Sequence, residues 1–397
     1  MLDVWPSLPL IVSHRGYQTG YEDNIIAALE CRGRIYRISL SILWGSELDI
    51  FLAAMQQPFP ELKTLALLSY NDQINTKTVE VVPDSFLGGS APRLEVLSLE
   101  GIPFPGLPKL LLSATHLVTL FLRHIPHSGY FSPDRMVTAL STLTSLSHLW
   151  LEFESPRSCP DTASRLLPPS TPSVLPVLAI FEFKGVSEYL DDLVACIDAP
   201  RLDIFEVTLF NDIVFDTPQL VRFIGLTPMS KALGTACISF YGGAARVDFL
   251  SQTRTSESRY PEFTVVILCN GLDWQVSSLQ QVCTSCQPSL SILEDLRIYE
   301  YSGLKPDWED RTENRQWLEL FRSFVAVKGL YLSEKLASSI APALQELVEG
   351  RTTDVLPALQ TIFLKELKSS GSVQESIGQF VAARRVANHP IVISPWT

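Results

Sequence analysis

Cysteine and histidine pairs at short spacing are the first candidates for chemistry in this sequence. Cys283-x-x-Cys286 has the spacing of a redox pair or of half a zinc site. A tetrahedral zinc site needs two further ligands, and the sequence holds no second Cys-x-x-Cys and no nearby pair of histidines. His124 and His127, with Asp134, are a second possible set of metal ligands. Because these histidines follow an apolar segment in a short loop, we expect surface histidines, reduced thiols and no metal site.

A second group of polar residues lies in "SHRGYQTGYEDN" and "SELDI". These stretches resemble the first motif of glycerophosphodiester phosphodiesterases, which hold a metal and protonate the leaving group with a His-Arg-Gly and a Glu-x-Asp. The resemblance gives these roles to His14, Arg15, Glu47 and Asp49. That family also needs a second catalytic histidine soon afterwards, and the next one here is His116. It needs a barrel of eight βα units as well, and the pattern described below differs from that.

Composition and charge exclude several other classes of function. Lys and Arg number 31 against 43 Asp and Glu, a net charge of −12 over 397 residues, so neither broad nucleic-acid binding nor attachment to an anionic membrane is expected. "FLGGSAP" lacks the lysine of a phosphate-binding loop, and no Gly-x-Ser-x-Gly nucleophile motif occurs. The seven cysteines do not suggest a disulfide framework, and no signal peptide or membrane-length apolar run is visible. We expect a protein of the cytoplasm or nucleus.

One recurring pattern sets the elements that position all these side chains. In "RLEVLSLEGI", Leu94, Leu97 and Leu99 are three and then two residues apart, which fits neither a helix nor a strand alone. The pattern recurs about every 30 residues, near the upper end of the period of leucine-rich repeats. Its other copies begin at Ile35, Leu62, Leu117, Leu146, Leu178, Leu202, Thr235, Phe263, Leu293, Val327 and Leu359.

This spacing predicts one short strand, and the turn before it, in each copy. The last two apolar residues point to the same side of the strand, and the first closes the turn that leads into it. Proline precedes several copies by two residues, as at Pro92 and Pro200. Proline has no backbone N–H, and just before a strand none is needed to bond to a neighbouring strand. Helices are expected between the strands, for example over residues 132–143, 187–198, 312–324 and 341–350. Stacked copies give an α/β fold, a leucine-rich-repeat-like solenoid (horseshoe) with parallel strands on the concave face and helices on the convex face.

Strand residues that point away from the core would line the concave face. The expected organisation is an N-terminal capping segment, residues 1–34, and an irregular solenoid of about twelve repeats, residues 35–397, that includes a C-terminal cap. Exposed aromatic residues beside arginine are enriched in protein interface hot spots. Phe121 and Trp150 on adjacent copies are therefore the preferred contact patch. The full predicted protein-binding set is Phe121, Arg123, Trp150, Glu152, Glu182, Lys184, Arg297, Tyr299 and Tyr331.

The repeats resemble leucine-rich repeats, and the two ends of the chain are similar to a narrower group. "LDVWPSLPLIV" with "NIIAALECRGRIYRISL", and "LPALQTIFL" with "VQESIGQFVAARRVANHPIVIS", resemble fungal (basidiomycete) F-box leucine-rich-repeat proteins. That resemblance implies a helical F-box module that docks a Skp-type adaptor of a ubiquitin ligase, while the repeats hold the substrate. No such module precedes the first repeat here, so binding of the adaptor is expected only if an F-box lies upstream of Met1. The Asn or Cys that usually follows the third leucine is missing, which predicts an irregular solenoid.

The sequence therefore predicts a non-catalytic module for protein-protein interaction, with no cofactor and a protein partner on the concave face. By the resemblance, it is a substrate-recognition protein in a ubiquitin ligase pathway. Two alternatives stay open. One is the metal-dependent phosphodiesterase, in which His14, Glu47 and Asp49 converge on one ion. The other is a truncated repeat protein that has kept no partner.

Overall fold

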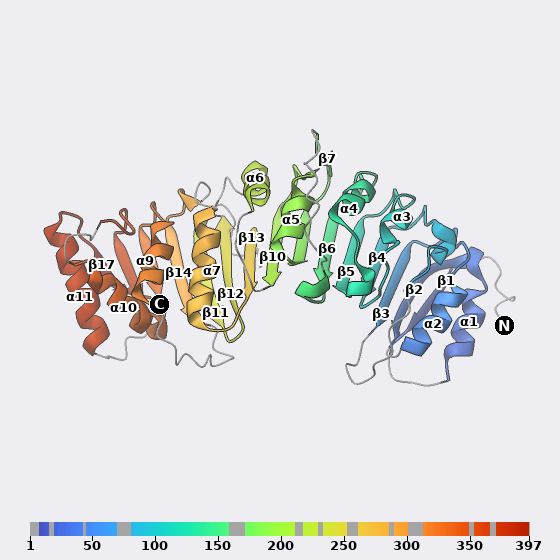
Figure 1. Cartoon of the computed structure of the whole chain (residues 1–397), viewed down its shortest axis with the longest axis horizontal. Helices are drawn as coiled ribbons and strands as arrows, with labels where there is room; N and C mark the ends of the chain where they lie inside the picture. The colour runs from blue at the N-terminus through green and yellow to red at the C-terminus, as the bar shows by residue number, and fades with distance from the viewer. Residues whose placement is uncertain are drawn as a thin grey trace. The chain divides into compact units, whose positions relative to one another are not determined.

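The structure is a computed structural model that forms two compact units, Met1–Leu202 (unit 1) and Asp203–Thr397 (unit 2) (Figure 1). The residues that it describes are 8–15, 20–42, 45–69, 81–158, 171–210, 217–228, 233–251, 261–285, 290–300, 313–348, 353–365 and 371–396.

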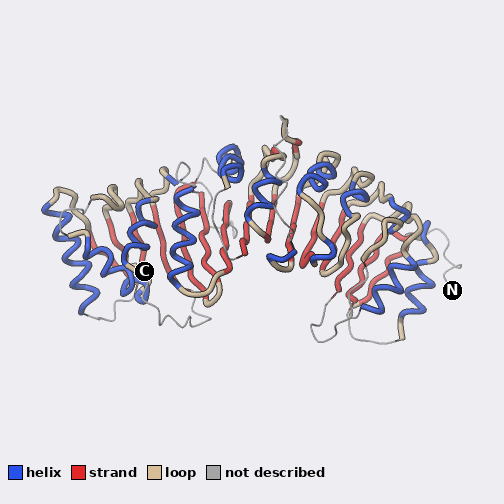
Figure 2. Tube along the Cα trace, viewed as in Figure 1, coloured by secondary structure: helices blue, strands red, loops and turns tan. Residues whose placement is uncertain are grey.

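Unit 1 alternates strands with short helices, and the helices lie on one side of the strands (Figure 2). Its strands are β1 (Leu10–His14), β2 (Ile35–Ile42), β3 (Thr64–Ser69), β4 (Val96–Glu100), β5 (Thr119–Ile125), β6 (His148–Phe153), β7 (Ser173–Val174), β8 (Ile180–Gly185) and β9 (Ile197–Asp198). Its α-helices are α1 (Glu22–Leu29), α2 (Gly45–Ala54), α3 (Leu107–Leu111), α4 (Pro133–Leu140) and α5 (Ser187–Val194). Short 3-10 helices are η2 (Arg32–Arg34), η3 (Phe86–Gly89), η4 (His127–Gly129) and η5 (Pro156–Ser158).

Strands β1 to β6 and β8 pair in chain order, and every pairing is parallel. Their register places the repeated apolar residues opposite one another, so each strand contributes one residue to a continuous row. One such row runs Ile38, Leu65, Leu97, Leu120, Leu149 and Phe181, and each side chain is at most 1% exposed. Strands β7 and β9 form a separate two-stranded parallel sheet.

The turn before each strand also follows the predicted pattern. The first apolar residue of a copy donates its backbone N–H to the carbonyl three residues earlier, as Leu94 does to Ala91 at 3.2 Å and Leu146 to Leu143 at 3.0 Å. The next residue then forms a hydrogen bond with the preceding repeat: the N–H of Glu95 donates to the carbonyl of Lys63 at 2.9 Å. This arrangement satisfies the turn's backbone groups and fixes the register of each strand on its neighbour.

Unit 2 also alternates strands with helices, but its strands do not all pair in the order in which they follow along the chain. Its strands are β10 (Ile204–Phe210), β11 (Leu233–Tyr241), β12 (Ala244–Ser251), β13 (Phe263–Leu268), β14 (Asp295–Glu300), β15 (Gly329–Leu332), β16 (Thr361–Leu364) and β17 (Val392–Pro395). Its helices are α6 (Pro218–Leu226), α7 (Leu272–Ser285), α9 (Asn314–Arg322), α10 (Glu334–Glu346) and α11 (Gly371–Val386). The spatial order is β10-β13-β12-β11-β14-β15-β16-β17, with β12 antiparallel to both of its neighbours.

The predicted fold class is confirmed: the chain is an α/β repeat protein with an open, mostly parallel arrangement of strands. All twelve predicted copies coincide with strands, namely β2 to β6, β8, β10, β11 and β13 to β16. The regular order expected through the copies at Thr235 and Phe263 is wrong, because β12 is inserted and β11 and β13 exchange places. Gly242 and Gly243 leave only a two-residue connection after β11, which permits a hairpin but no crossover to a parallel neighbour.

The predicted helices are also present, although their bounds differ by several residues. The regions predicted over 132–143, 187–198 and 312–324 contain α4, α5 and α9, and α10 begins before the predicted 341–350 and ends within it. Strands β1 and β17 extend the sheet beyond the predicted copies. The division into a cap, residues 1–34, and a solenoid, residues 35–397, stays a prediction. Of the helices that the structure describes, none combines the length and the apolar character that a membrane crossing requires.

Candidate protein-binding surface

Each strand of the main sheet presents alternate residues on the outer face, which we define as the face away from the helices. Between the buried core residues of β5 and β6, Phe121, Arg123 and Trp150 are half-buried. The predicted binding residues fall into one group in each unit. Phe121, Arg123, Trp150, Glu152, Glu182 and Lys184 lie on β5, β6 and β8 of unit 1, and Arg297, Tyr299 and Tyr331 lie on β14 and β15 of unit 2.

The unit 1 group is built around Trp150. Phe121 lies directly opposite Trp150 in the β5–β6 pairing, and the rings meet edge to face with centroids 5.9 Å apart and planes at 82°. The guanidinium carbon of Arg123 lies 4.7 Å from the centre of the Trp150 ring, a cation–π contact. The structure thus places Phe121, Arg123 and Trp150 in contact on two adjacent strands, β5 and β6.

Glu152 holds the cations of this group in place. Its side chain is 8% exposed and accepts a 2.8 Å hydrogen bond from Nζ of Lys184, its register partner on β8. Nε of Arg123 lies 3.7 Å from the other carboxylate oxygen, while Nη1 of Arg123 donates to Glu100 at 3.3 Å. A burial this deep leaves little surface for a partner, so Glu152 acts by positioning Arg123 and Lys184. We call Phe121, Arg123, Trp150, Glu152 and Lys184 the Trp150 patch.

His124 joins this cluster through an irregularity that the sequence pattern did not indicate. The β5–β6 register shifts between Leu122 and Ile125, and His124 has a φ of 51°, in the left-handed region. This conformation turns an exposed imidazole toward two carboxylates, with Nδ1 3.6 Å from Glu100 and Nε2 3.6 Å from Glu152. Glu182, the remaining predicted residue of this unit, lies opposite Trp150 in the β6–β8 pairing.

The unit 2 group centres on Tyr331. Its ring stacks on Phe363 with centroids 4.2 Å apart and planes at 8°, and it meets Trp396 edge to face at 5.6 Å. The guanidinium carbon of Arg297 lies 5.1 Å from the Tyr331 ring centre, and Nζ of Lys365 lies 5.8 Å from the Trp396 ring centre. We call these five residues the Tyr331 patch. The sequence reasoning missed Trp396, although the β-branched run before it signals a final strand.

Tyr299, the remaining predicted residue of unit 2, interacts electrostatically with Asp248 and Arg246 in a polar cluster on β12 and β13. Arg246 forms a bidentate pair with Asp248, at 2.8 and 2.9 Å, and Thr264 donates to Asp248 at 2.6 Å. Burial raises the pKa of Tyr299 to about 12, so its hydroxyl stays neutral and capable of donating a hydrogen bond. Because β12 lies outside the predicted repeat, this cluster has no counterpart in the sequence prediction.

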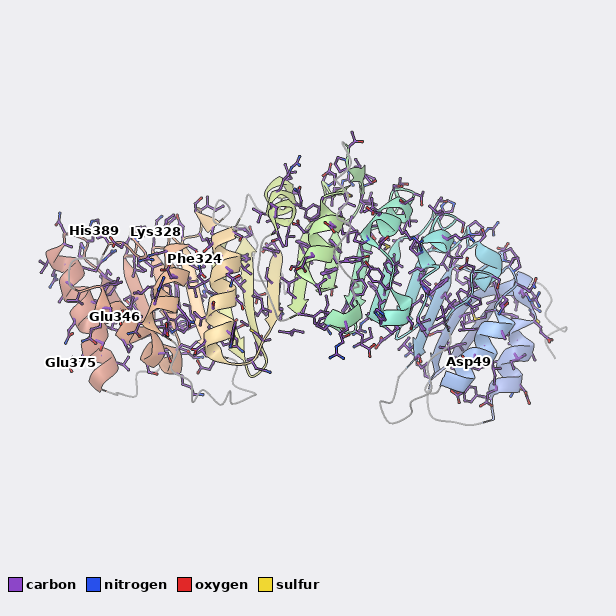
Figure 3. The ribbon with its side chains drawn as sticks, viewed as in Figure 1. Asp49, Phe324, Lys328, Glu346, Glu375 and His389 are labelled. Atoms are coloured by element: carbon purple, nitrogen blue, oxygen red, sulfur yellow. The ribbon has the colours of Figure 1, made fainter. Side chains whose placement is uncertain are left out.

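The N-terminal residues of the phosphodiesterase alternative are only partly brought together. His14 stacks on Tyr21 with ring centroids 3.5 Å apart, and the Tyr21 hydroxyl donates to Glu47 at 3.3 Å. Burial and Glu47 raise the pKa of Tyr21 to about 12. Asp49 lies on α2 (labelled in Figure 3). Among the residues that the structure describes, no group of three or more His, Cys, Asp or Glu side chains is placed to hold a metal ion.

The other candidate ligands are dispersed over several elements. Cys283 is buried in α7, and Cys286 lies outside the described residues, so that pair stays a prediction. His127 lies in η4 and Asp134 in the first turn of α4. Among the described cysteines, Cys31, Cys196, Cys237 and Cys269 are free thiols.

Comparisons with known proteins add little to this picture. No protein-family model matches the sequence, and no curated protein matches it. Among solved structures, the chain is similar to the leucine-rich repeat-containing protein LegL7 from Legionella pneumophila. The identity is 11% and the TM-score 0.31, over 94% of this chain and 97% of that one. A likeness at this level carries no argument, and the function has to be inferred from the surface itself.

Proposed function

We propose that this chain is a non-catalytic protein-binding module that holds another protein on the outer face of unit 1. The observation that carries the proposal is the Trp150 patch. A tryptophan, a phenylalanine and an arginine lie half-buried side by side on adjacent strands. Tryptophan and arginine are enriched among the residues that dominate binding energy, and phenylalanine is enriched in protein interfaces.

The patch is preorganised, which favours binding over simple packing. Arg123 is held between the carboxylates of Glu100 and Glu152, and Lys184 is bonded to Glu152, so these long side chains are already ordered before a partner arrives. Ordering a flexible side chain at an interface costs about 0.5–1.5 kcal/mol, and a preformed patch avoids much of that cost.

The finer role, substrate recognition in a ubiquitin ligase pathway, rests only on the resemblance of the chain ends to fungal F-box proteins. It requires that a Skp-type adaptor binds an F-box upstream of Met1. A pulldown with the natural transcript's product tests this step: recovery of an adaptor supports the ligase role, and recovery of a partner without an adaptor leaves a recognition module alone.

The binding proposal is tested with two matched tryptophan variants. Immobilised wild-type chain, Trp150→Ala and Trp274→Ala are exposed to lysate of the source organism, and bound proteins are quantified by mass spectrometry. Trp274 lies on α7 and is 68% exposed, so its variant controls for loss of any surface tryptophan. A partner that the wild type and Trp274→Ala retain and Trp150→Ala loses supports the proposal.

Two results would count against it. Identical protein profiles for all three chains would show that the Trp150 patch holds no partner. Metal-dependent hydrolysis of a glycerophosphodiester that His14→Ala abolishes would instead favour the enzymatic alternative.

A further inference from the structure

The two outer-face patches differ in how their cations are compensated. In the Trp150 patch, Arg123 and Lys184 both face carboxylates. In the Tyr331 patch, Arg297 and Lys365 form no ion pair with any residue that the structure describes. The neighbouring acids are engaged elsewhere: Glu294 pairs with Lys328 at 2.6 Å, and Glu300 lies 3.9 Å from Lys335.

Arg297 shows this lack of compensation most clearly. Its Nε is buried and makes no hydrogen bond to any described residue, while its guanidinium rests on the Tyr331 ring. Asp295 lies two residues earlier on the same face of β14, opposite Gly329, and acts on Arg297 only at longer range. A guanidinium held in this way can pair with an anionic group from outside the unit.

An aromatic surface adjoins both cations. Tyr331 lies on β15, Phe363 on β16 and Trp396 directly after β17, and all three are half-buried, so their rings remain accessible. Arg297 lies on β14, and Lys365 directly follows β16, two residues beyond Phe363, which is in register with Arg297 through Tyr331. Two strand spacings and this offset along the strand separate their backbones by roughly 12 Å. An occupant therefore needs two negative charges at about that separation and apolar groups beside them that can cover the rings.

A polyproline II segment meets this requirement. It has three residues per turn and rises about 3.1 Å per residue, so residues three apart project from the same side about 9 Å from each other, and flexible glutamate side chains extend this reach to both cations. Proline rings stack readily on aromatic side chains, and a preformed extended helix loses little entropy on binding. A sequence of the type Glu-Pro-Pro-Glu would place its carboxylates over Arg297 and Lys365 and its prolines over the rings.

We propose that the Tyr331 patch is a binding site for an acidic, proline-rich extended segment of a partner protein. The inference rests on the proposed role of the chain as a binding module but uses a different surface from the Trp150 patch. Single-stranded RNA also combines negative charge with groups that stack on aromatic rings. Recognition of a nucleic-acid backbone relies on many cations, and this patch offers two, which favours the peptide.

Fluorescence anisotropy with the full chain and labelled (Glu-Pro-Pro)4 tests the proposal, with (Gln-Pro-Pro)4 and a twelve-residue uridine RNA as competing probes. We expect (Glu-Pro-Pro)4 to bind and the other two to bind at least tenfold more weakly. Arg297→Gln and Lys365→Gln should each weaken binding, Arg297→Gln by about tenfold, the effect of losing one hot-spot contact. Tyr331→Ala should weaken it as well, and Tyr331→Phe, which keeps the stacked ring, should not.

The control for charge is Arg315→Gln, which removes one positive charge from α9, where the Arg315 side chain is 84% exposed. Binding should be unchanged in this variant and in Trp150→Ala. No binding of (Glu-Pro-Pro)4 at millimolar concentration, equal binding of (Gln-Pro-Pro)4, tighter binding of the RNA, or an equal loss in Arg315→Gln would each overturn the inference. A failure here leaves the Trp150 pulldown unaffected, and a negative pulldown leaves the peptide measurement unaffected, so the two proposals fail separately.

Discussion

Phe121 and Trp150 are register partners on β5 and β6, and their rings meet edge to face 5.9 Å apart on the outer face of unit 1. Neighbouring parallel strands always place side chains in such lateral pairs, but here both members are large and half-buried. The pair therefore contributes to the stability of the sheet as well as offering surface to a partner.

The first prediction concerns this aromatic pair. Phe121→Ala, Trp150→Ala and the double variant should show a coupling free energy of about 0.5–1.5 kcal/mol in urea unfolding, because edge-to-face rings interact beyond their buried area. Strictly additive effects of the two substitutions would contradict the contact between the rings.

The second prediction concerns the buried carboxylate beneath the Trp150 patch. Glu152→Gln should lower the free energy of unfolding by about 1–3 kcal/mol, since Lys184 and Arg123 lose the charge that faces them. Glu154→Gln is the matched control, because Glu154 is exposed and its variant should change stability by less than about 0.5 kcal/mol. Equal effects in urea unfolding would show that Glu152 does not organise the patch.

The third prediction compares three glycines in unit 1. Gly101 has a φ of 67°, and a Cβ there would overlap the carbonyl oxygen of Ser69. Gly20 has a φ of 87° with open space around it, and Gly33 has neither constraint. Alanine should therefore destabilise the protein by more than about 2 kcal/mol at position 101, by about 1 kcal/mol at position 20 and by almost nothing at position 33. Thermal or urea unfolding gives the order directly, and any other order would contradict the backbone geometry.

The fourth prediction concerns a buried arginine in α11. Arg384 is 0% exposed, and one terminal nitrogen donates to the carbonyls of Leu356, Pro357 and Leu359 at 3.2–3.4 Å. Arg384→Met should cost about 1–3 kcal/mol, because the carbonyls of Leu356, Pro357 and Leu359 lose the hydrogen bonds that this buried side chain donates. Hydrogen exchange of residues 353–365 should accelerate in this variant and stay unchanged in Arg385→Met, whose native side chain is exposed. Unchanged protection in both variants would exclude this anchoring role.

The fifth prediction is a loss of stability of unit 2 at alkaline pH. Burial raises the pKa of Cys237 and of Cys269 from 9.0 to about 11. Between these values the unfolded chain releases thiol protons that the folded chain keeps, so the free energy of unfolding falls as the pH rises from 9.0 to about 11. The double variant Cys237→Ala and Cys269→Ala should show a smaller decline across this window in urea unfolding. An identical decline in the variant would assign the effect to other groups.

The repeat itself could be predicted from the sequence because its signal is local. Leu94, Leu97 and Leu99 specify a turn and a strand within six residues, and a buried row forms wherever such copies stack. The order of neighbours is a different kind of information. The apolar spacing of β11 and β13 does not indicate which strand each will pair with. Their pairing partners are determined by the insertion of β12 between them.

The chemical details of the surface depend on contacts between strands and could be predicted only in part. Phe121, Trp150 and Arg123 follow from alternation along neighbouring copies. The burial of Glu152 does not, because it results from side chains that converge from β5 and β8. The bulge that turns His124 toward Glu100 leaves no trace in the apolar pattern.

The exchanged places of β11 and β13 have a consequence for how unit 2 is assembled during translation. When β10 and β11 have left the ribosome, the strand that will lie beside β10 has not yet been made, since β13 follows later in the chain. The addition of strands to the sheet in the order of their synthesis is therefore interrupted at β10. The nascent chain has to keep that edge free of wrong partners until the β11–β12 hairpin and β13 arrive together.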